Sequence, residues 1–373
     1  MSDFSILGVG DVAAKRADMA SMFRGVVDQL RTAPVVFGQL ETVMSDRGLP
    51  AHNAKLAMRT DPALAPVLAD SGFTMMSFAG NHCFDWGAEA FADTLAHART
   101  AGLLVAGAGP DIDAARAPVI QTHDGTRVAL IAASSILPAG YAAGPNKPGC
   151  APIWAHTLYD QIELDQPGTA PRIRTYADPD DLAALLATIR TAKAEADIVL
   201  LSLHWGIHMV RGTLADYQRE VAHAAIEAGA DAILGHHPHL MKGIGFHRGK
   251  PIFYSLGNFA IEQPHVFDPA IVETDSFRHL VSLNPDWSLE SAYMLPEETR
   301  ITGIARLVVR DGAIVETRLR PCWIADDSAP RALRHDDPLF ARAEEYLVAV
   351  THEEKLRTAF RRDGDELVIA PID

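Results

Sequence analysis

Cysteine is scarce in this 373-residue chain, and its cysteines are not grouped. The three cysteines, Cys83, Cys150 and Cys322, stand far apart and form no Cys-x-x-Cys pair. A disulfide framework and a cysteine-ligated zinc site both need closely spaced cysteines, so we expect neither. The three thiols are typical of a chain that folds in a reducing compartment.

Basic residues and long apolar runs are also in short supply. The chain has 33 basic against 48 acidic residues and a net charge of −15. Because nucleic acids and anionic lipids are bound through basic patches, we expect no nucleic-acid partner. Residues 1–11 lack the basic start and the apolar stretch of a secretion signal, and no later run reaches the length of a membrane span. These absences predict a cytoplasmic chain without a membrane span, and they leave the oligomeric state open.

The first two-thirds of the chain alternate between apolar runs and amphipathic stretches. This pattern is typical of β-α units around a parallel or mixed sheet and predicts an α/β fold. We expect a helix over 19–31, for example, and a second over 180–194 that leads into a buried strand over 198–203. Residues 138–171 are rich in glycine and proline and show no period, which predicts a long loop.

The pattern changes after residue 269. Two strands joined at Asp311-Gly312, one helix and a last strand are too few elements to form a core alone. We therefore expect residues 1–373 to form a single domain, in which 1–260 carry the site and 270–373 complete a second sheet.

Histidines gather after two of the predicted buried strands. The run ending at Leu234 leads into Gly235-His236-His237-Pro238-His239, and the strand over 198–203 leads into His204. Ligand sites of open α/β sheets lie outside the carboxyl ends of the strands. One such histidine is more often a core or cap residue, but four in this setting indicate a metal site.

Three other strand ends add oxygen donors. Asp11, Glu41 and Asn81 each follow an apolar run, and His82 comes directly after Asn81. Each alone is consistent with a turn or a helix cap. Together with the histidines they form the mixture of carboxylate, carboxamide and imidazole donors that binds Mn, Fe or Zn ions, so we expect one or two divalent ions.

These residues lie in motifs that resemble a known family. The resemblance is to the CapA-type proteins named for poly-γ-glutamate capsule synthesis, which belong with the calcineurin-like metallophosphoesterases. It implies a double β-sandwich flanked by α-helices, a four-layer αββα fold. The motifs occur in order over residues 1–260: Gly10-Asp11-Val12, Gln39-Leu40-Glu41, Gly80-Asn81-His82, Phe84-Asp85-Trp86-Gly87, His204-Trp205-Gly206, Gly235-His236-His237-Pro238-His239 and the run 252–259.

The resemblance also implies individual roles. Asp11 would be a ligand of the first metal, Glu41 would bridge two metals, and Asn81 and His204 would serve the second. His237 and His239 match the paired His-x-His of the superfamily, which leaves His236 as an alternative ligand or a residue behind the ligands. His82 matches the general acid that protonates the leaving group, and Asp85 would hold its tautomer.

Two positions depart from the calcineurin-like pattern. Ala13 stands where these enzymes usually have a histidine ligand, and Glu41 replaces the usual aspartate. The missing histidine leaves open whether one or two ions bind.

The function implied by the resemblance is hydrolysis by metal-activated water. We expect a metal-dependent hydrolase of an amide or peptide-like bond, with a γ-glutamyl-type bond in a small acidic substrate as the candidate. Phosphoester hydrolysis, metal-assisted epimerisation and a non-catalytic role in poly-γ-glutamate binding or biosynthesis are the alternatives. His208, Arg211 and Lys147 are candidates for substrate binding, since cationic side chains clamp carboxylates and phosphates.

Overall fold

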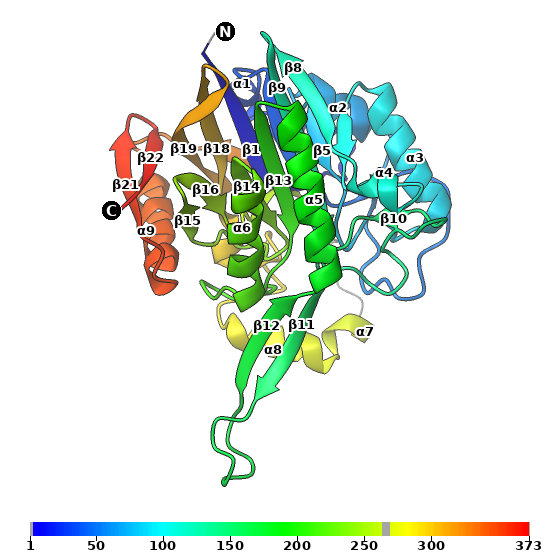
Figure 1. Ribbon diagram of the computed structural model, residues 1–373, viewed down its shortest axis with the longest axis vertical. Coiled ribbons are helices and arrows are strands. Elements are labelled where there is room, and N and C mark those ends of the chain that lie inside the picture. The colour runs from blue at the N-terminus through cyan, green and yellow to red at the C-terminus, as the bar shows by residue number, and fades with distance from the viewer. Residues whose placement is uncertain (1–2, 263–268, 373) are drawn as a thin grey trace.

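Two β-sheets pack face to face between layers of helices in the computed structural model, which describes residues 3–262 and 269–372 (Figure 1). This is the mixed α/β sandwich expected above. The first sheet has the order β21 (Thr358–Asp363), β22 (Glu366–Pro371), β19 (Ala313–Ile324), β18 (Ile301–Arg310), β1 (Phe4–Ala13), β2 (Val35–Leu40), β5 (Met75–Ser77) and β6 (Leu104–Ala106), with β17 (Asn258–Ile261) beside β1 and β20 (Pro330–Ala332) beside β19.

The second sheet is smaller and faces the first. Its order is β15 (Ile244–His247), β16 (Lys250–Phe253), β14 (Ala232–His236), β13 (Ile198–His204), β9 (Thr126–Ser134) and β8 (Val119–His123). Short pairs join β3 (Val43–Met44) to β4 (Arg59–Thr60), β7 (Ala108–Gly109) to β10 (Gly149–Cys150), and β11 (Ala155–Asp160) to β12 (Arg172–Ala177).

Helices cover the outer faces of both sheets. The long helices α5 (Pro179–Glu195) and α6 (Asp216–Ala228) lie over the second sheet, and α9 (Pro338–Glu353) packs on β19 and β15 (Figure 1). The other helices are α1 (Val27–Leu30), α2 (Leu64–Asp70), α3 (Gly87–Thr100), α4 (Ile112–Arg116), α7 (Pro269–Val272) and α8 (Asp275–Leu283). Within the described residues, no helix has the combination of length and apolarity that crossing a bilayer demands.

The continuous apolar run of β13 explains why this strand is central. Ile198 and Leu200 belong to the core between the two sheets, whereas Val199 and Leu201 pack among residues of α5 and α6. Successive side chains of a strand point to opposite faces, so a strand buried on both faces must be apolar throughout. β9 and β14 lie on either side of β13 and pair with it in parallel.

The carboxyl ends of the parallel strands meet at one edge of the sandwich. β1, β2 and β5 run parallel in the first sheet, and β9, β13 and β14 run parallel in the second. Because the two sheets face each other, the residues that follow these strands converge between them.

β1 changes partner halfway along its length. Its first half pairs with antiparallel β18, up to Gly8 opposite Ala305, and its second half pairs with parallel β17, where Asp11 lies opposite Asn258. The change occurs at Gly10, where an added Cβ would lie 2.0 Å from the carbonyl oxygen of Gly257. Only glycine permits this close approach of the two backbones.

Several predictions of local structure were wrong. Residues 19–31 form a 3-10 turn over Met19–Phe23 and the short α1 instead of one helix, and Gly25 between them packs directly on the Pro330 carbonyl. The region 138–171 is not wholly a loop, because it contains β10 and β11. The two helices over 269–283 were not predicted.

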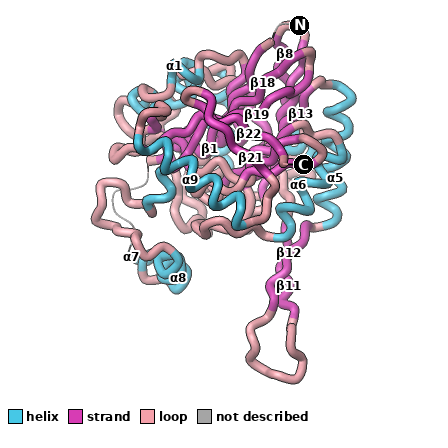
Figure 2. Tube along the Cα trace, turned by 90° about the vertical axis from the view of Figure 1, so that its left-hand side faces the viewer, coloured by secondary structure: helices cyan, strands magenta, loops and turns pink. Residues whose placement is uncertain are grey.

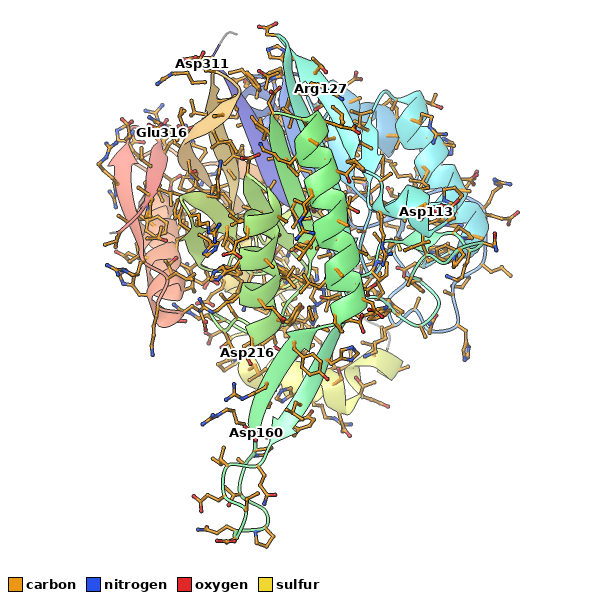
Figure 3. The ribbon with its side chains drawn as sticks, viewed as in Figure 1. Asp113, Arg127, Asp160, Asp216, Asp311 and Glu316 are labelled. Carbon is orange, nitrogen blue, oxygen red and sulfur yellow. The ribbon has the colours of Figure 1, made fainter. Side chains whose placement is uncertain are left out.

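The pair β11–β12 forms an arm that projects from the body of the molecule (Figure 2). In Figure 3 Asp160 lies out along this arm and Asp216 at its base, where the Asp216 carboxylate accepts a hydrogen bond of 3.2 Å from the Thr175 amide. A projecting two-stranded arm buries little surface against the core. The cross-strand pairs that hold it together do not determine the direction in which it leaves the body of the molecule.

Candidate metal centre

Two carboxylates are buried side by side at the converging strand ends. Asp11 lies in β1 and Glu41 directly follows β2, and their exposed fractions are 0% and 2%. Burial raises the pKa of Glu41 well above its usual range, and the negative charges of Asp11 and Asp85 add to this. Burial acts the same way on Asp11, but contact with His236 outweighs it and lowers the pKa of that carboxyl. Among the described residues, histidines are the only basic side chains within 4 Å of the two carboxylates.

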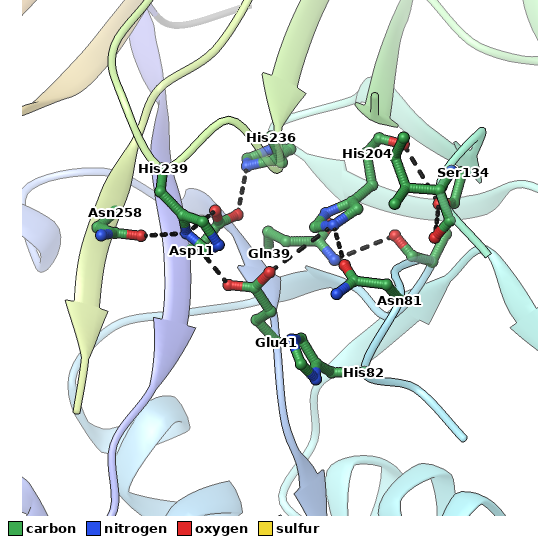
Figure 4. A network of polar contacts seen from close by, with 12 residues as sticks. Asp11, Gln39, Glu41, Asn81, His82, Ser134, His204, His236, His239 and Asn258 are labelled. Carbon is green, nitrogen blue, oxygen red and sulfur yellow. Dashed lines mark hydrogen bonds and ion pairs between the residues drawn. The ribbon is translucent and has the colours of Figure 1, made fainter. Parts of the chain in front are cut away.

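The first group of candidate ligands surrounds Asp11 (Figure 4). One donor atom each from Asp11, Glu41 and His239 lie within 4.8 Å of one another. His239 Nδ1 is 3.8 Å from Asp11 Oδ2 and 3.9 Å from Glu41 Oε2. Asn258 Oδ1 lies 2.7 Å from the same nitrogen, so its carboxamide oxygen faces this group as well.

A second group of donors lies on the other side of Glu41. His204 Nε2 is 2.6 Å from Asn81 Oδ1 and 3.7 Å from Glu41 Oε1. The His237 ring lies beside it, with 5.0 Å between its centroid and that of His204. The other oxygen of Glu41 faces His239, so this residue stands between the two groups.

The imidazoles are held in the neutral form that binds metals. Burial lowers the pKa of His204 to about 3 and that of His237 well below its usual range. Burial also lowers the pKa of His239. Since only a neutral imidazole offers a lone pair, these side chains are ready to act as ligands without first losing a proton.

The backbone around Pro238 is strained in a way that serves the site. His237 has φ of 94° and His239 has φ of 59°, values that residues with a side chain rarely adopt. The two unusual residues flank one proline and turn both imidazoles toward the converging strand ends. Such strain is concentrated at functional sites, where the surrounding structure holds it in place.

The donors fit a divalent cation. Asp11 Oδ2, Glu41 Oε1 and His237 Nδ1 are buried and have no hydrogen-bond partner in the described part of the chain. Buried polar atoms are almost always satisfied, and a bound cation would satisfy these. Carboxylate, carboxamide and imidazole donors together suit Mn, Fe or Zn ions.

His236 occupies a different place from its two neighbours. It ends β14, is fully buried, and its Nδ1 lies 3.2 Å from Asp11 Oδ1. Its ring packs against Phe37, with 5.4 Å between the centroids. His236 thus lies behind Asp11, and its role as an alternative ligand or as a residue behind the ligands stays a prediction.

His82 and Asp85 form a separate pair at the wall of the site. His82 Nδ1 lies 2.6 Å from Asp85 Oδ2. Asp85 is held in turn by the Tyr141 hydroxyl, at 2.9 Å, and by the Met58 amide, at 2.7 Å. A carboxylate with this many donors is fixed in position, and it fixes the imidazole ring that it contacts.

A cavity of about 630 Å³ opens beside the centre. This is within the range of small-molecule sites. The polar residues among its described lining include Glu41, Asn81, His82, Asp85, His208, His237 and His239. Burial and the neighbouring His239 lower the pKa of His208 to about 3, so this ring is neutral.

Two of the basic residues predicted to bind substrate do not reach this cavity. The Lys147 ammonium contacts carbonyl oxygens of its own loop, among them Ala142 at 2.6 Å. The Arg211 guanidinium lies 3.1 Å from Glu298 and 3.3 Å from Glu353. Neither is among the described residues of the cavity lining, so the geometry gives no support to these two candidates.

Sequence reasoning gave no role to Asn258 or Tyr141. Asn258 follows Gly257, as Asp11 follows Gly10 and Asn81 follows Gly80. This repeated glycine-polar pair at strand ends was a usable signal. The position of Tyr141 in a loop without periodicity carried none.

The two-sheet sandwich gathers carboxylate, carboxamide and imidazole donors in one buried cluster at its strand ends. Residues 5–263 match the family described as Bacterial capsule synthesis protein PGA_cap, and the chain belongs to this family.

Known relatives are similar over part of their length. The chain is 31% identical over 245 residues to "PGA biosynthesis protein CapA" of Bacillus subtilis (strain 168), a match that covers 65% of this chain and 57% of that protein. It is 30% identical over 307 residues to "Uncharacterized protein y4uA" of Sinorhizobium fredii, covering 69% and 66%. The chain thus spans less than two thirds of these relatives.

A solved structure aligns more distantly. The crystal structure of calcineurin-like phosphoesterase YfkN from Bacillus subtilis aligns with a TM-score of 0.42 at 12% identity, over 95% of this chain and 98% of that one. An alignment at this level carries no conclusion about activity.

Proposed function

We propose that this protein is a metal-dependent hydrolase of an amide or peptide-like bond. The observation that carries the proposal is the position of His82, which lines the cavity beside Asn81 and is held by Asp85 through Nδ1. The printed name of the Bacillus subtilis relative, a PGA biosynthesis protein, makes a γ-glutamyl-type bond in a small acidic substrate the candidate.

The candidate ligands would hold two ions. Asp11, Glu41, His239 and Asn258 would hold the first, and Glu41, Asn81, His204 and His237 the second. When bound, divalent ions supply Lewis-acid activation of water and of a substrate oxygen.

His82 supplies the proton chemistry. With Nδ1 engaged by Asp85, its Nε2 is the nitrogen left to exchange a proton with the substrate. In the reaction, the oxygen of water bonds to the carbonyl carbon and the C–N bond breaks, with its electron pair going to nitrogen. That nitrogen takes a proton from His82, and the proton that the water loses restores the imidazole. One water is consumed and no further reactant is needed.

Apart from the ions, the lining offers little cationic charge. Lys55 is the single Lys or Arg among the described lining residues, and it is exposed. Phosphate sites commonly add Lys or Arg side chains to the charge of their ions. Their scarcity here supports a neutral amide as the substrate.

Chromogenic substrates test the proposal. Protein loaded with Mn²⁺ should release p-nitroaniline from γ-glutamyl-p-nitroanilide, and His82→Gln should lose most of this rate while keeping its metal. Turnover of bis-p-nitrophenyl phosphate instead would favour the phosphoesterase alternative. Incorporation of solvent deuterium at an α-carbon without cleavage would favour the epimerase, and indifference to His82→Gln would favour a non-catalytic role.

A further inference from the structure

The cavity beside the metal centre is lined by both polar and apolar side chains. The polar residues include candidate ligands and His82. The apolar residues include Met58, Ile261, Phe277, Leu280, Trp287 and Leu295. A substrate that fills the cavity must therefore present an apolar group next to its reactive bond.

Ala13 packs behind two apolar residues of the cavity lining. It pairs with Ile261 across β1 and β17, and the two pack with Met58 in one buried cluster. Ile261 and Met58 both reach the cavity. The position where the calcineurin-like pattern has a histidine is thus filled here by a residue that supports the apolar lining.

Phe277, Leu280 and Trp287, which lie in and just after α8, form an apolar wall of the cavity. Phe277 and Trp287 pack with 5.3 Å between their ring centroids, and the Trp287 indole donates a hydrogen bond of 2.6 Å to the Met294 carbonyl. Leu280 and Trp287 pack on the buried cluster that contains Met209.

The wall is also tied to the loop that carries His208. The Asn284 carboxamide donates a hydrogen bond of 3.1 Å to the Met209 carbonyl, next to His208. This hydrogen bond links the segment that follows α8 to the loop that carries His208.

The apolar part of the lining does not suit a carboxylate. Lys55 is the one Lys or Arg among the described lining residues, and it is exposed. A substrate carboxylate placed against Phe277, Leu280 and Trp287 would be desolvated without a partner, at a cost in binding.

We propose that the substrates are short amides that combine an acidic acyl part with a bulky apolar group on the amine side, such as a γ-glutamyl conjugate of an aromatic amino acid. This inference rests on the proposed function and names its substrate class. The apolar group lies against Phe277, Leu280 and Trp287, and Lys55 faces the acidic group. The lining thereby selects against a γ-glutamyl chain, whose every residue adds a carboxylate.

Binding of two matched dipeptides tests this. γ-Glutamyl-phenylalanine and γ-glutamyl-glutamate are titrated calorimetrically into Mn²⁺-loaded His82→Gln protein, in which the proposed proton donor is absent, so that binding is measured apart from turnover. We expect the phenylalanine conjugate to bind at least about tenfold more tightly, the usual consequence of filling an apolar pocket.

Two variants of one helix serve as test and control. Leu280→Ser, in the same background, should reduce the preference about tenfold. Leu283→Ser changes a residue that is 44% exposed on the same helix and lies outside the described lining, and it should leave the preference unchanged.

The outcomes separate the substrate class from the reaction. Equal or tighter binding of γ-glutamyl-glutamate overturns the inference, as does a preference that Leu280→Ser leaves intact or the absence of saturable binding by either dipeptide. Selective binding of γ-glutamyl-phenylalanine that His82-containing protein does not cleave upholds the substrate class and overturns the proposed hydrolysis alone.

Discussion

Asp11 lies opposite Asn258 in the parallel pair of β1 and β17, and this register places a carboxamide at the first group of candidate ligands. Asn258 is almost fully buried, and its Oδ1 lies 2.7 Å from His239 Nδ1. Ala13 stands where the calcineurin-like pattern usually has a histidine, and we propose that Asn258 supplies an oxygen in its place from the neighbouring strand. Under this proposal the first ion would have four donors.

Asn258→Ala should therefore weaken binding of one ion by about tenfold or more, the usual cost of removing a contact to a metal centre. Asn258→Asp should retain both ions, because it keeps an oxygen at the same position. Elemental mass spectrometry after dialysis against a weak chelator measures this. Unchanged stoichiometry and affinity in Asn258→Ala would show that Asn258 only orients His239.

Removal of metal should lower the thermal stability of the protein. Asp11 and Glu41 are buried together with no described Lys or Arg in contact, so a bound cation relieves an unfavourable charge pair. A ligand that binds only the folded state at 100 times its Kd stabilises it by about 2.7 kcal/mol. Thermal unfolding with and without EDTA should show a higher Tm for the Mn²⁺-loaded protein. An equal Tm in both conditions would contradict a buried metal site.

His82→Gln should lower kcat by about 10²- to 10⁴-fold, the usual contribution of a general acid, with little change in KM. Asp85→Asn should give a smaller loss, since it disturbs the tautomer and position of His82 while keeping its size. Metal content should stay at the parental value in both variants. A loss of metal in step with activity would instead place these residues in support of the ligands.

The three thiols should be unreactive in the folded protein. Burial and contact with Cys150 raise the pKa of Cys83 well above its usual range, and burial raises that of Cys322 to about 12. Cys150 is fully buried, and its sulfur lies 2.8 Å from that of Cys83. At pH 8 a thiol reagent should label none of them rapidly, and all three after unfolding in guanidinium. Fast labelling of the native chain would contradict this packing.

Lys242 should make stability depend on alkaline pH. Its ammonium is buried and donates to the carbonyls of Val210 and Thr213, and burial lowers its pKa from 10.5 to about 8. Between these values the unfolded chain binds more protons than the folded one, so the free energy of unfolding should rise with pH from about 8 to 10.

The size of this rise follows from the shift and is on the order of 1–2 kcal/mol. Urea unfolding at pH 8 and pH 10 measures it, with Lys242→Met as the control that should lose this part of the rise. An identical rise in the variant would assign it to other groups.

Much of the centre was predictable because each strand end carries its own local signal. An apolar run followed by a polar residue marks the end of a buried strand, and this pattern placed Asp11, Glu41, Asn81 and the histidines at one edge. The α/β fold followed from the alternation of apolar runs and amphipathic stretches. These features depend on residues close together in the chain.

The tertiary structure decided the features that depend on distant segments. Which strand pairs with the second half of β1 is set by the close contact of Gly10 with Gly257, and this brings Asn258 beside Asp11. The packing of α8 on Met209 and the loop interactions of Lys147 likewise join residues far apart in sequence. Local patterns fix which side chains are buried, but the partner of an edge and the direction of a loop depend on contacts that form only when the whole chain folds.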